Sequence, residues 1–288
     1  MIVGTPSPRF EPVPTADGFK PFPFRPDMVI DGWSMAQMTV RGTSVRGHFH
    51  RYNGAPRQDD FAIHRLSDKR IAVAVADGVS QAMQSHIGAT TAVRYAIQWL
   101  ASQAETDPLH LDWLPLLQGA AWALAEQVQA LASLNEPDPA RAEQELACTL
   151  VCALVEQSGS DQFRAHVVSV GDSGVWLLRK GSFLEVAGGK AVGSGGISSS
   201  AVSALPRVPN VVTPTVVEFG PGDVLMIGTD GIGDPLGSGT GGVGNLFRDL
   251  LCDIEPPTLL EFARAVDFSR ETFDDDRTLV AIRVDRAA

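Results

Sequence analysis

The most regular apolar stretch of the chain covers residues 71–76, which read Ile-Ala-Val-Ala-Val-Ala. A strand without polar alternation is typically buried on both faces, so we expect this segment in a covered sheet. The run ends at Asp77-Gly78. Taken alone, this pair is most simply a turn. It nevertheless places a carboxylate at the edge of a buried strand, where an unpaired charge is costly.

Strand-like and helix-like patterns follow one another along the rest of the chain. Short apolar runs between turn residues predict strands at residues 38–44, 61–66, 70–76, 147–155, 163–170, 174–179, 183–186, 215–219, 223–228 and 278–284. Apolar positions spaced three and four apart predict helices at residues 85–104, 113–134, 245–253 and 257–266. Residues 187–209 are rich in Gly and Ser and are interpreted as a flap. A phosphate-cradling loop is the alternative, although the strand, loop and helix context for it is lacking.

The order of these elements indicates the fold class. Strands, two long helices, more strands, more helices and a last strand are typical of one α+β domain with sheets between helical layers. We assign this domain to residues 33–288. Residues 1–32 are rich in proline and have no clear period, which predicts an extended N-terminal arm.

The charge and the cysteines limit the class of protein. Asp and Glu number 34 against 23 Lys and Arg, and the formal net charge is −11. This excess argues against nucleic acid as a partner and suits a protein that holds cations. No apolar run approaches the roughly 20 residues of a membrane span, and no secretory signal is recognised. The three cysteines lack zinc-site spacing, so we expect a cytoplasmic protein without a membrane partner.

Acidic residues recur at the ends of the predicted strands. Asp77, Asp172 and Asp230 each follow a strand beside a glycine, whereas Asp59 and Asp275 precede strands. If these ends converge, the carboxylates repel one another unless cations neutralise them. Oxygen ligands favour Mg²⁺, Mn²⁺ or Ca²⁺ over zinc, and two such ions suit phosphoester hydrolysis. The alternative is that these are separate solvated turns.

Five motifs carry a family resemblance when they are taken in order. They are Arg57-Gln58-Asp59, Val75-Ala76-Asp77-Gly78, Val170-Gly171-Asp172-Ser173, Thr229-Asp230-Gly231 and Asp275-Asp276-Arg277-Thr278. With these motifs the chain resembles the metal-dependent Ser/Thr protein phosphatases of type 2C over about residues 43–284. The segment Ser85-His86-Ile87-Gly88-Ala89 is most similar to a bacterial branch of that family.

The resemblance implies a four-layer α-β-β-α sandwich, with two mainly antiparallel sheets and two Mn²⁺ or Mg²⁺ ions at one end. The implied metal-site residues are Asp59, Asp77, Gly78, Asp172, Asp230 and Asp275. Asp77 would bridge the two ions, and Gly78 would offer its carbonyl. Asp230 and Asp275 would complete the first ion's ligands, and Asp59 would hold metal-bound water. The aspartate of the Gly-Asp-Ser motif would bind a third, weaker ion. A hydroxide bridging the two ions would attack phosphorus in line.

Two positions depart from the family pattern. An arginine that grips phosphate often stands five residues before the position of Asp59, where this chain has Gly54. His50, Arg51 and Arg57 are the candidates for this catalytic role. Some members also carry a histidine directly after the Asp-Gly pair as a general acid, and this chain has valine there. His50 is the candidate substitute, against the alternative of a solvated loop histidine.

These observations predict a phosphatase that acts on phosphorylated Ser or Thr in proteins. We expect it to be a monomer that works beside a cognate kinase. One alternative is a catalytically silent relative that binds phosphoproteins. The missing arginine favours this alternative, whereas the retained carboxylates argue against it. Another alternative is a hydrolase of small phosphorylated molecules that uses the same metal site.

Overall fold

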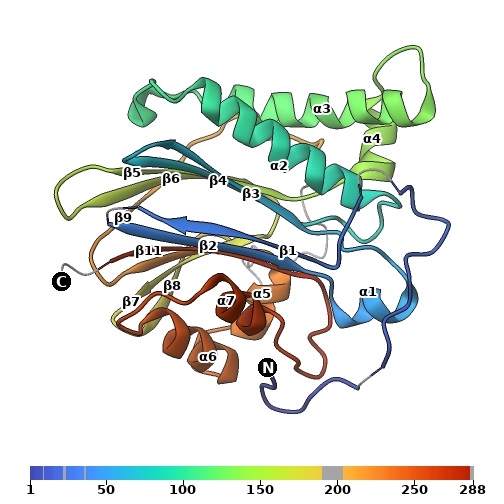
Figure 1. Cartoon of the computed structure of the whole chain (residues 1–288). Coiled ribbons are helices and arrows are strands. Elements are labelled where there is room, and N and C mark those ends of the chain that lie inside the picture. The colour runs from blue at the N-terminus through green and yellow to red at the C-terminus, as the bar shows by residue number, and fades with distance from the viewer. Residues whose placement is uncertain (9, 22–23, 36, 190–203, 286–288) are drawn as a thin grey trace, which may run out of the picture.

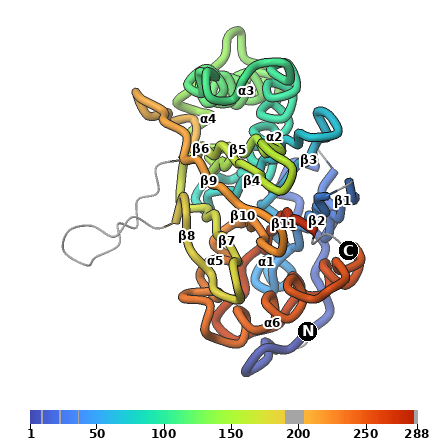
Figure 2. The backbone as a smooth tube through the Cα atoms, turned by 90° about the vertical axis from the view of Figure 1, so that its left-hand side faces the viewer, coloured from blue at the N-terminus to red at the C-terminus, as the bar shows by residue number. Residues whose placement is uncertain are grey.

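Two antiparallel sheets stack face to face between two layers of helices (Figure 1). This computed structural model describes all of residues 1–288 except 9, 22–23, 36, 190–203 and 286–288. Every named strand pair is antiparallel. The predicted α+β sandwich is therefore confirmed, and Figure 2 shows its layers from the side.

One sheet has six strands in the order β1-β2-β11-β10-β7-β8, and the other has five in the order β3-β4-β5-β6-β9. The bounds of the first sheet are β1 Met28–Ser34, β2 Met38–Val45, β7 Gly174–Arg179, β8 Ser182–Gly188, β10 Val224–Gly228 and β11 Arg277–Val284. Those of the second are β3 Asp60–Ser67, β4 Arg70–Ala76, β5 Leu150–Gln157, β6 Phe163–Val170 and β9 Thr215–Phe219.

Helices cover the outer face of each sheet (Figure 1). The five-stranded sheet is covered by α2 Ser85–Ser102, α3 Leu114–Ala132 and α4 Pro139–Leu146, with a short 3₁₀ turn at Pro108–His110. The six-stranded sheet is covered by α5 Asp230–Leu236, α6 Gly242–Leu251 and α7 Leu259–Val266. The short helix α1, His48–Asn53, lies at one end of the sandwich. None of the helices in the described ranges combines the length and the apolar character that crossing a membrane requires.

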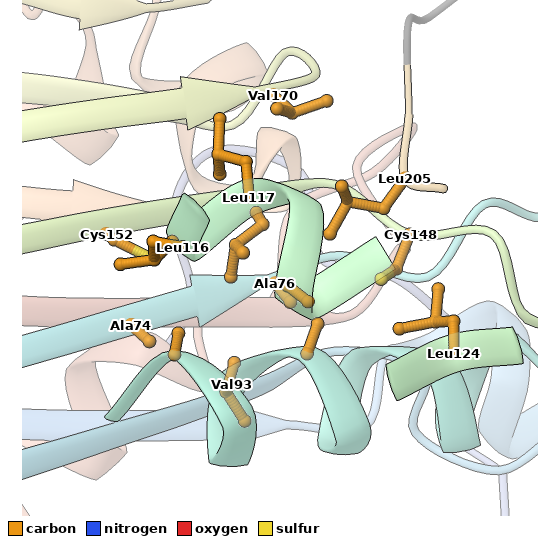
Figure 3. Packing of buried hydrophobic residues seen from close by; sticks show 14 of the residues in the cluster. Ala74, Ala76, Val93, Leu116, Leu117, Leu124, Cys148, Cys152, Val170 and Leu205 are labelled. Carbon is orange, nitrogen blue, oxygen red and sulfur yellow. The ribbon is translucent and has the colours of Figure 1, made fainter. Parts of the chain in front are cut away.

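The alternation of large and small side chains along β4 explains how the layers pack. Val73 and Val75 point toward the other sheet and join the central core. Ala74 and Ala76 point the opposite way, toward α2 and α3, where their small side chains allow close approach (Figure 3). Burying one such valine contributes about 1.5–3 kcal/mol. The predicted burial of this strand on both faces is confirmed.

Several elements differ from the sequence expectations. Regular structure begins at β1, before residue 33, and the short helices α1, α4 and α5 were not expected. Pro139 is the first residue of α4, which the Asp138 side chain caps by accepting a hydrogen bond from the Arg141 amide at 3.0 Å. Strand β5 starts at Leu150, three residues later than expected.

The packing of α2 against the end of α4 predicts a stability defect. A Cβ atom added at Gly88 would stand 1.8 Å from the Leu146 carbonyl oxygen. We expect Gly88→Ala to lower the free energy of unfolding by about 1–3 kcal/mol, because the helices must move apart. Urea unfolding of both proteins measures this change. At Gly241 an added Cβ meets nothing within 4 Å, so Gly241→Ala should cost at most about 0.5 kcal/mol. Equal effects of the two changes would contradict the packing argument.

Candidate metal centre

The strand ends that carry the acidic motifs lie at one end of the sandwich. In the five-stranded sheet, the last residues of β4 and β6 pair with the first residues of β3 and β5. In the six-stranded sheet, the last residue of β10 pairs with the first residue of β7 and with a residue near the start of β11. Asp77, Asp172, Asp230 and Asp275 lie directly beyond these ends. Antiparallel register thus brings together residues that are far apart in the sequence.

These side chains surround a cavity of about 190 Å³. Its lining consists of Asp77, Gly78, Val79, Ser80, Gln81, Thr149, Asp172, Asp230 and Asp275. Five of the six residues expected at a metal site therefore line one cavity. Among the described residues of this lining, none is Lys or Arg. Four carboxylate side chains thus share one small cavity.

Asp59, the sixth expected residue, lies beneath the cavity. It is 1% exposed and accepts a hydrogen bond of 2.8 Å from the Thr229 hydroxyl. Its carboxylate acts on Asp77 strongly enough to raise the pKa of Asp77. Asp59 is thus placed to support the residues of the lining from behind.

The pKa values of the carboxylates show how strongly they repel. Burial and the charges of Asp59, Asp230 and Asp275 hold the pKa of Asp77 well above its ordinary value. Burial and the charges of Asp276 and Asp275 raise the pKa of Asp59 to about 8. Burial and the charges of Asp276 and Asp230 raise the pKa of Asp275 to about 6. Such a cluster is stabilised when a cation enters it.

The donor set fits a hard divalent cation. The cavity offers four carboxylates, together with the Gly78 main chain and the Thr149 hydroxyl, all of them oxygen donors. Neither cysteine nor histidine is found among the residues of this lining that the structure describes. Oxygen donors of this kind suit Mg²⁺ and Mn²⁺ and do not suit a structural zinc ion.

Asp276 is an important member of the site that the sequence analysis did not single out. It is 2% exposed, and its carboxylate accepts the Gly47 amide at 2.6 Å and the Gln58 amide at 2.5 Å. Its Oδ1 lies 2.9 Å from His50 Nδ1. It therefore joins α1, the segment before β3 and the start of β11. The run of three aspartates at residues 274–276 is the sequence signal that could have marked it.

His50 is buried at the edge of this site. Burial alone would lower its pKa, but the charge of Asp276 and the hydrogen bond to it, with the charges of Asp275 and Asp59, raise the pKa to about 8. Ligand atoms of His50, Asp275 and Asp276 lie within 4.8 Å of one another. His50 is 6% exposed, so the structure places it against the site rather than in a solvated loop.

The two candidate arginines occupy different surroundings. Arg51 forms an ion pair with Asp267 at 3.2 Å. Arg57 is 1% exposed and donates to the Ser44 hydroxyl and to the Asp59 carbonyl oxygen. Burial and the charge of Arg25 lower the pKa of Arg57 to about 10, which leaves it charged at neutral pH. Neither arginine lines the cavity.

The structure explains the glycine at the position of the expected arginine. Gly54 ends α1 with φ of 76° and ψ of 15°, a left-handed conformation that favours glycine. A Cβ atom there would stand 3.0 Å from the Pro14 carbonyl oxygen. The N-terminal segment thus covers the place from which a side chain would extend.

A set of hydroxyl groups supports the carboxylates, and the sequence analysis missed it. The Thr149 hydroxyl accepts the Asp77 amide at 2.9 Å and lies 2.8 Å from the Ser173 hydroxyl. The Thr229 hydroxyl, which donates to Asp59, accepts the Thr278 amide at 3.2 Å. The visible signal is that Ser173 and Thr229 directly adjoin acidic residues of the motifs.

The predicted flap, residues 187–209, falls mostly outside the described part of the chain, because residues 190–203 are not described. Its last part is anchored beside the cavity. Leu205 is fully buried and exchanges two main-chain hydrogen bonds with Cys148, the neighbour of Thr149. The flap itself stays a prediction.

The family of the chain follows from its sequence. A profile described as protein phosphatase 2C matches residues 46–258, well over half of the chain. The chain therefore belongs to the protein phosphatase 2C family, in agreement with the acidic site at the end of a β-sandwich. Among curated proteins, none matches the chain significantly.

Solved structures of bacterial phosphatases share the fold. The Mycobacterium tuberculosis serine/threonine phosphatase PstP/Ppp has 19% sequence identity and a TM-score of 0.53, over 87% of this chain and 100% of that one. A PstP catalytic domain in complex with two manganese ions has 20% identity and a TM-score of 0.52, over 87% and 99%. RsbX in complex with magnesium has 14% identity and a TM-score of 0.56, over 89% and 100%.

Proposed function

We propose that the chain is a metal-dependent phosphatase that removes phosphate from phosphoserine or phosphothreonine in proteins. The observation that carries the proposal is the single cavity lined by Asp77, Asp172, Asp230 and Asp275, with Asp59 behind it. Four carboxylates around one cavity, with oxygen donors beside them, suit a site for divalent cations. The manganese and magnesium bound in the PstP and RsbX structures support the choice of metal.

The residues of the chain would divide the work as follows. Asp77, the Gly78 carbonyl, Asp230 and Asp275 would hold two Mn²⁺ or Mg²⁺ ions, and Asp172 would take part in a third, weaker site. When bound, the ions supply positive charge for the phosphoryl group and an activated water for in-line attack. The hydrogen bond from Thr229 to Asp59 fixes the orientation of that carboxylate. Ordered supports of this kind are typical around metal ligands.

His50 is our candidate for moving a proton. Its pKa of about 8, raised by Asp276, keeps the ring protonated at neutral pH. A protonated imidazole at the edge of the site can give a proton to a departing serine or threonine oxygen. Arg51 and Arg57 stay weaker candidates for gripping phosphate, because Arg51 is paired with Asp267 and Arg57 is buried in main-chain contacts.

Location and partners belong to the same proposal. We infer a monomer in the cytoplasm that reverses the action of a protein kinase. The buried thiols of Cys148 and Cys152 form no disulfide, which agrees with a reducing compartment.

Hydrolysis of phosphopeptides tests the proposed function. We expect release of phosphate from phosphothreonine and phosphoserine peptides in the presence of MnCl₂, and loss of that activity with a chelator. Nucleoside monophosphates serve as the comparison substrates. Faster release from nucleotides would favour a small-molecule hydrolase. Calorimetric Mn²⁺ binding without any turnover would favour the silent, phosphoprotein-binding alternative, for which the absence of an arginine in the described lining is the supporting observation.

A further inference from the structure

The N-terminal segment before β1 lies against two stretches of the metal site. The Val13 amide donates to the Arg51 carbonyl oxygen at 2.8 Å, and the Ala16 amide donates to that of Gly54 at the same distance. The Lys20 amide then donates to the Gln84 side chain at 2.9 Å, in the loop that follows Asp77-Gly78. This segment lies outside the family match, which begins at residue 46. Figure 1 shows the segment passing α1 at that end of the sandwich.

Among the described residues of this segment, Arg25 is the most deeply buried charged one. Its side chain is 6% exposed. The guanidinium donates through Nε and Nη2 to the Arg57 carbonyl oxygen, at 3.1 Å each, and through Nη2 to the Asp59 carbonyl oxygen. Nη1 binds Asp60 Oδ2 at 2.7 Å and also contacts the Thr90 hydroxyl. One side chain thus binds three of the four residues at positions 57–60, where β3 begins, and Gln58 is the exception.

Arg57 in turn contacts the N-terminal segment. Its Nε donates to the Pro26 carbonyl oxygen at 3.2 Å, and its Nη1 donates to the Asp59 carbonyl oxygen at 2.5 Å. Arg25 binds the main chain of residue 57, and Arg57 binds the main chain of residue 26. We call this pair the arginine clasp. Asp60 lies between the two guanidinium groups, 2.7 Å from Arg25 and 3.5 Å from Arg57.

The clasp acts on the main chain that carries the Asp59 carboxylate. Asp59 is 1% exposed, and its carboxylate accepts the Thr229 hydroxyl at 2.8 Å. Both arginines of the clasp donate to the carbonyl oxygen of this same residue. Charge-assisted hydrogen bonds of this kind are stronger than neutral ones. They hold the Asp59 main chain in place while its carboxylate remains next to Asp77.

We propose that Arg25 is a positioning residue of the metal centre, which holds Asp59 in the geometry that divalent cations need. This inference rests on the proposed function, because it assigns to Arg25 a role in metal binding. The N-terminal segment is then a working part of the phosphatase and not a passive extension. Asp59 is supported from two sides, by Thr229 at its carboxylate and by the clasp at its carbonyl.

The test compares Arg25→Ala and Arg25→Lys with the matched control Arg70→Ala, all in the full chain. Arg70 also joins a carboxylate, Glu156 at 3.0 Å, to two carbonyl oxygens, those of Ala104 and Thr106. It begins β4, at the opposite end of the strand from the metal site. We therefore expect the removal of either arginine to lower the stability of the fold. Of the two, only Arg25 contacts the segment that carries Asp59.

Three measurements separate positioning from stability. Calorimetry of chelator-treated protein with MnCl₂ should show that Arg25→Ala raises the Kd for Mn²⁺ by about 10–100-fold, the range typical of residues that support metal ligands. Hydrogen exchange of the metal-free protein should accelerate at residues 57–61. Millimolar guanidinium should recover part of the Mn²⁺ affinity of Arg25→Ala, whereas sodium at equal ionic strength should not. Arg25→Lys should lie between Arg25→Ala and the unchanged protein, because an ammonium cannot reach all of these acceptors.

The outcomes test the role of Arg25 separately from the proposed phosphatase function. Arg70→Ala should keep the Mn²⁺ affinity of the unchanged protein even where its thermal midpoint falls. If Arg25→Ala changes neither the Mn²⁺ affinity nor the hydrogen exchange at residues 57–61, the proposed role of Arg25 is overturned. The phosphatase proposal is left intact by that result. An unchanged protein that neither binds Mn²⁺ nor releases phosphate would overturn the proposed function, and the role of Arg25 with it.

Discussion

Replacing Asp77 by Asn is expected to lower Mn²⁺-dependent phosphate release by more than about 100-fold, beyond the usual effect of residues that only support ligands. Asp77 is the carboxylate whose pKa is raised by three others, Asp59, Asp230 and Asp275. It therefore stands where a bound cation would gain most from negative charge. The amide keeps the shape of the side chain and removes the charge. Steady-state release from a phosphothreonine peptide measures the loss.

A stability measurement on the same variant separates lost chemistry from lost folding. Asp77→Asn removes one member of a repelling group, so the metal-free variant should unfold at a temperature equal to or above that of the unchanged protein. Asp68→Asn is the matched control. The Asp68 side chain is 86% exposed, in the turn between β3 and β4 at the end remote from the cavity. The Asp68→Asn variant should keep the phosphate-release activity of the unchanged protein. Full activity in Asp77→Asn would contradict the assignment of the site.

The metal-free protein is expected to lose stability as the pH rises from about 5 to about 8. Asp275 and Asp59 have folded-state pKa values of about 6 and about 8, against an ordinary value of 3.8. A carboxyl group with a raised pKa contributes stability that is full below 3.8 and is lost as the pH passes through its folded-state value. His50, raised from 6.5 to about 8, loses its contribution in the upper part of the same window. The three effects have the same sign. Burial lowers the pKa of His86 from 6.5 to about 4, so His86 opposes them only below about 6.5, and the loss is steepest above that pH.

Calorimetric unfolding at several pH values measures this loss. The midpoint of the chelator-treated protein should fall most steeply between about pH 6.5 and 8, and saturating MnCl₂ should remove most of the fall, because bound cations favour the ionised carboxylates. Asp59→Asn should flatten the upper part of the profile while the Thr229 hydroxyl keeps an oxygen to donate to. A metal-free midpoint that is constant or rises over this range would show that the carboxylates are not in mutual repulsion.

The sequence was most informative where chemistry and local pattern coincide. The valine-rich run before Asp77 predicts a strand buried on both faces, and β4 is one. The acidic residues beside glycine at strand ends predict a shared site, and the cavity brings Asp77, Asp172 and Asp230 together. These inferences need only the period of a strand and the cost of a buried charge.

The missed features depend on contacts between distant parts of the chain. Asp276 supports the site by accepting amides of Gly47 and Gln58, more than 200 residues away in sequence. Arg25 lies in a proline-rich segment without periodicity, so no local pattern distinguishes it from a solvated arginine. In the sequence, Gly54 stands where the family often has an arginine. In the structure, its left-handed φ and the neighbouring Pro14 carbonyl explain why this position is a glycine. The boundary between an arm, residues 1–32, and the domain stays a prediction.

We propose that the carboxylate cavity holds two divalent cations and that Asp77 binds both of them. Calorimetric titration of the chelator-treated protein with MnCl₂, beside the same titration of Asp77→Asn, tests it most directly. We expect at least two Mn²⁺ ions per chain in the unchanged protein and loss of both tight sites in the variant. Equal stoichiometry and affinity in the two proteins would contradict it.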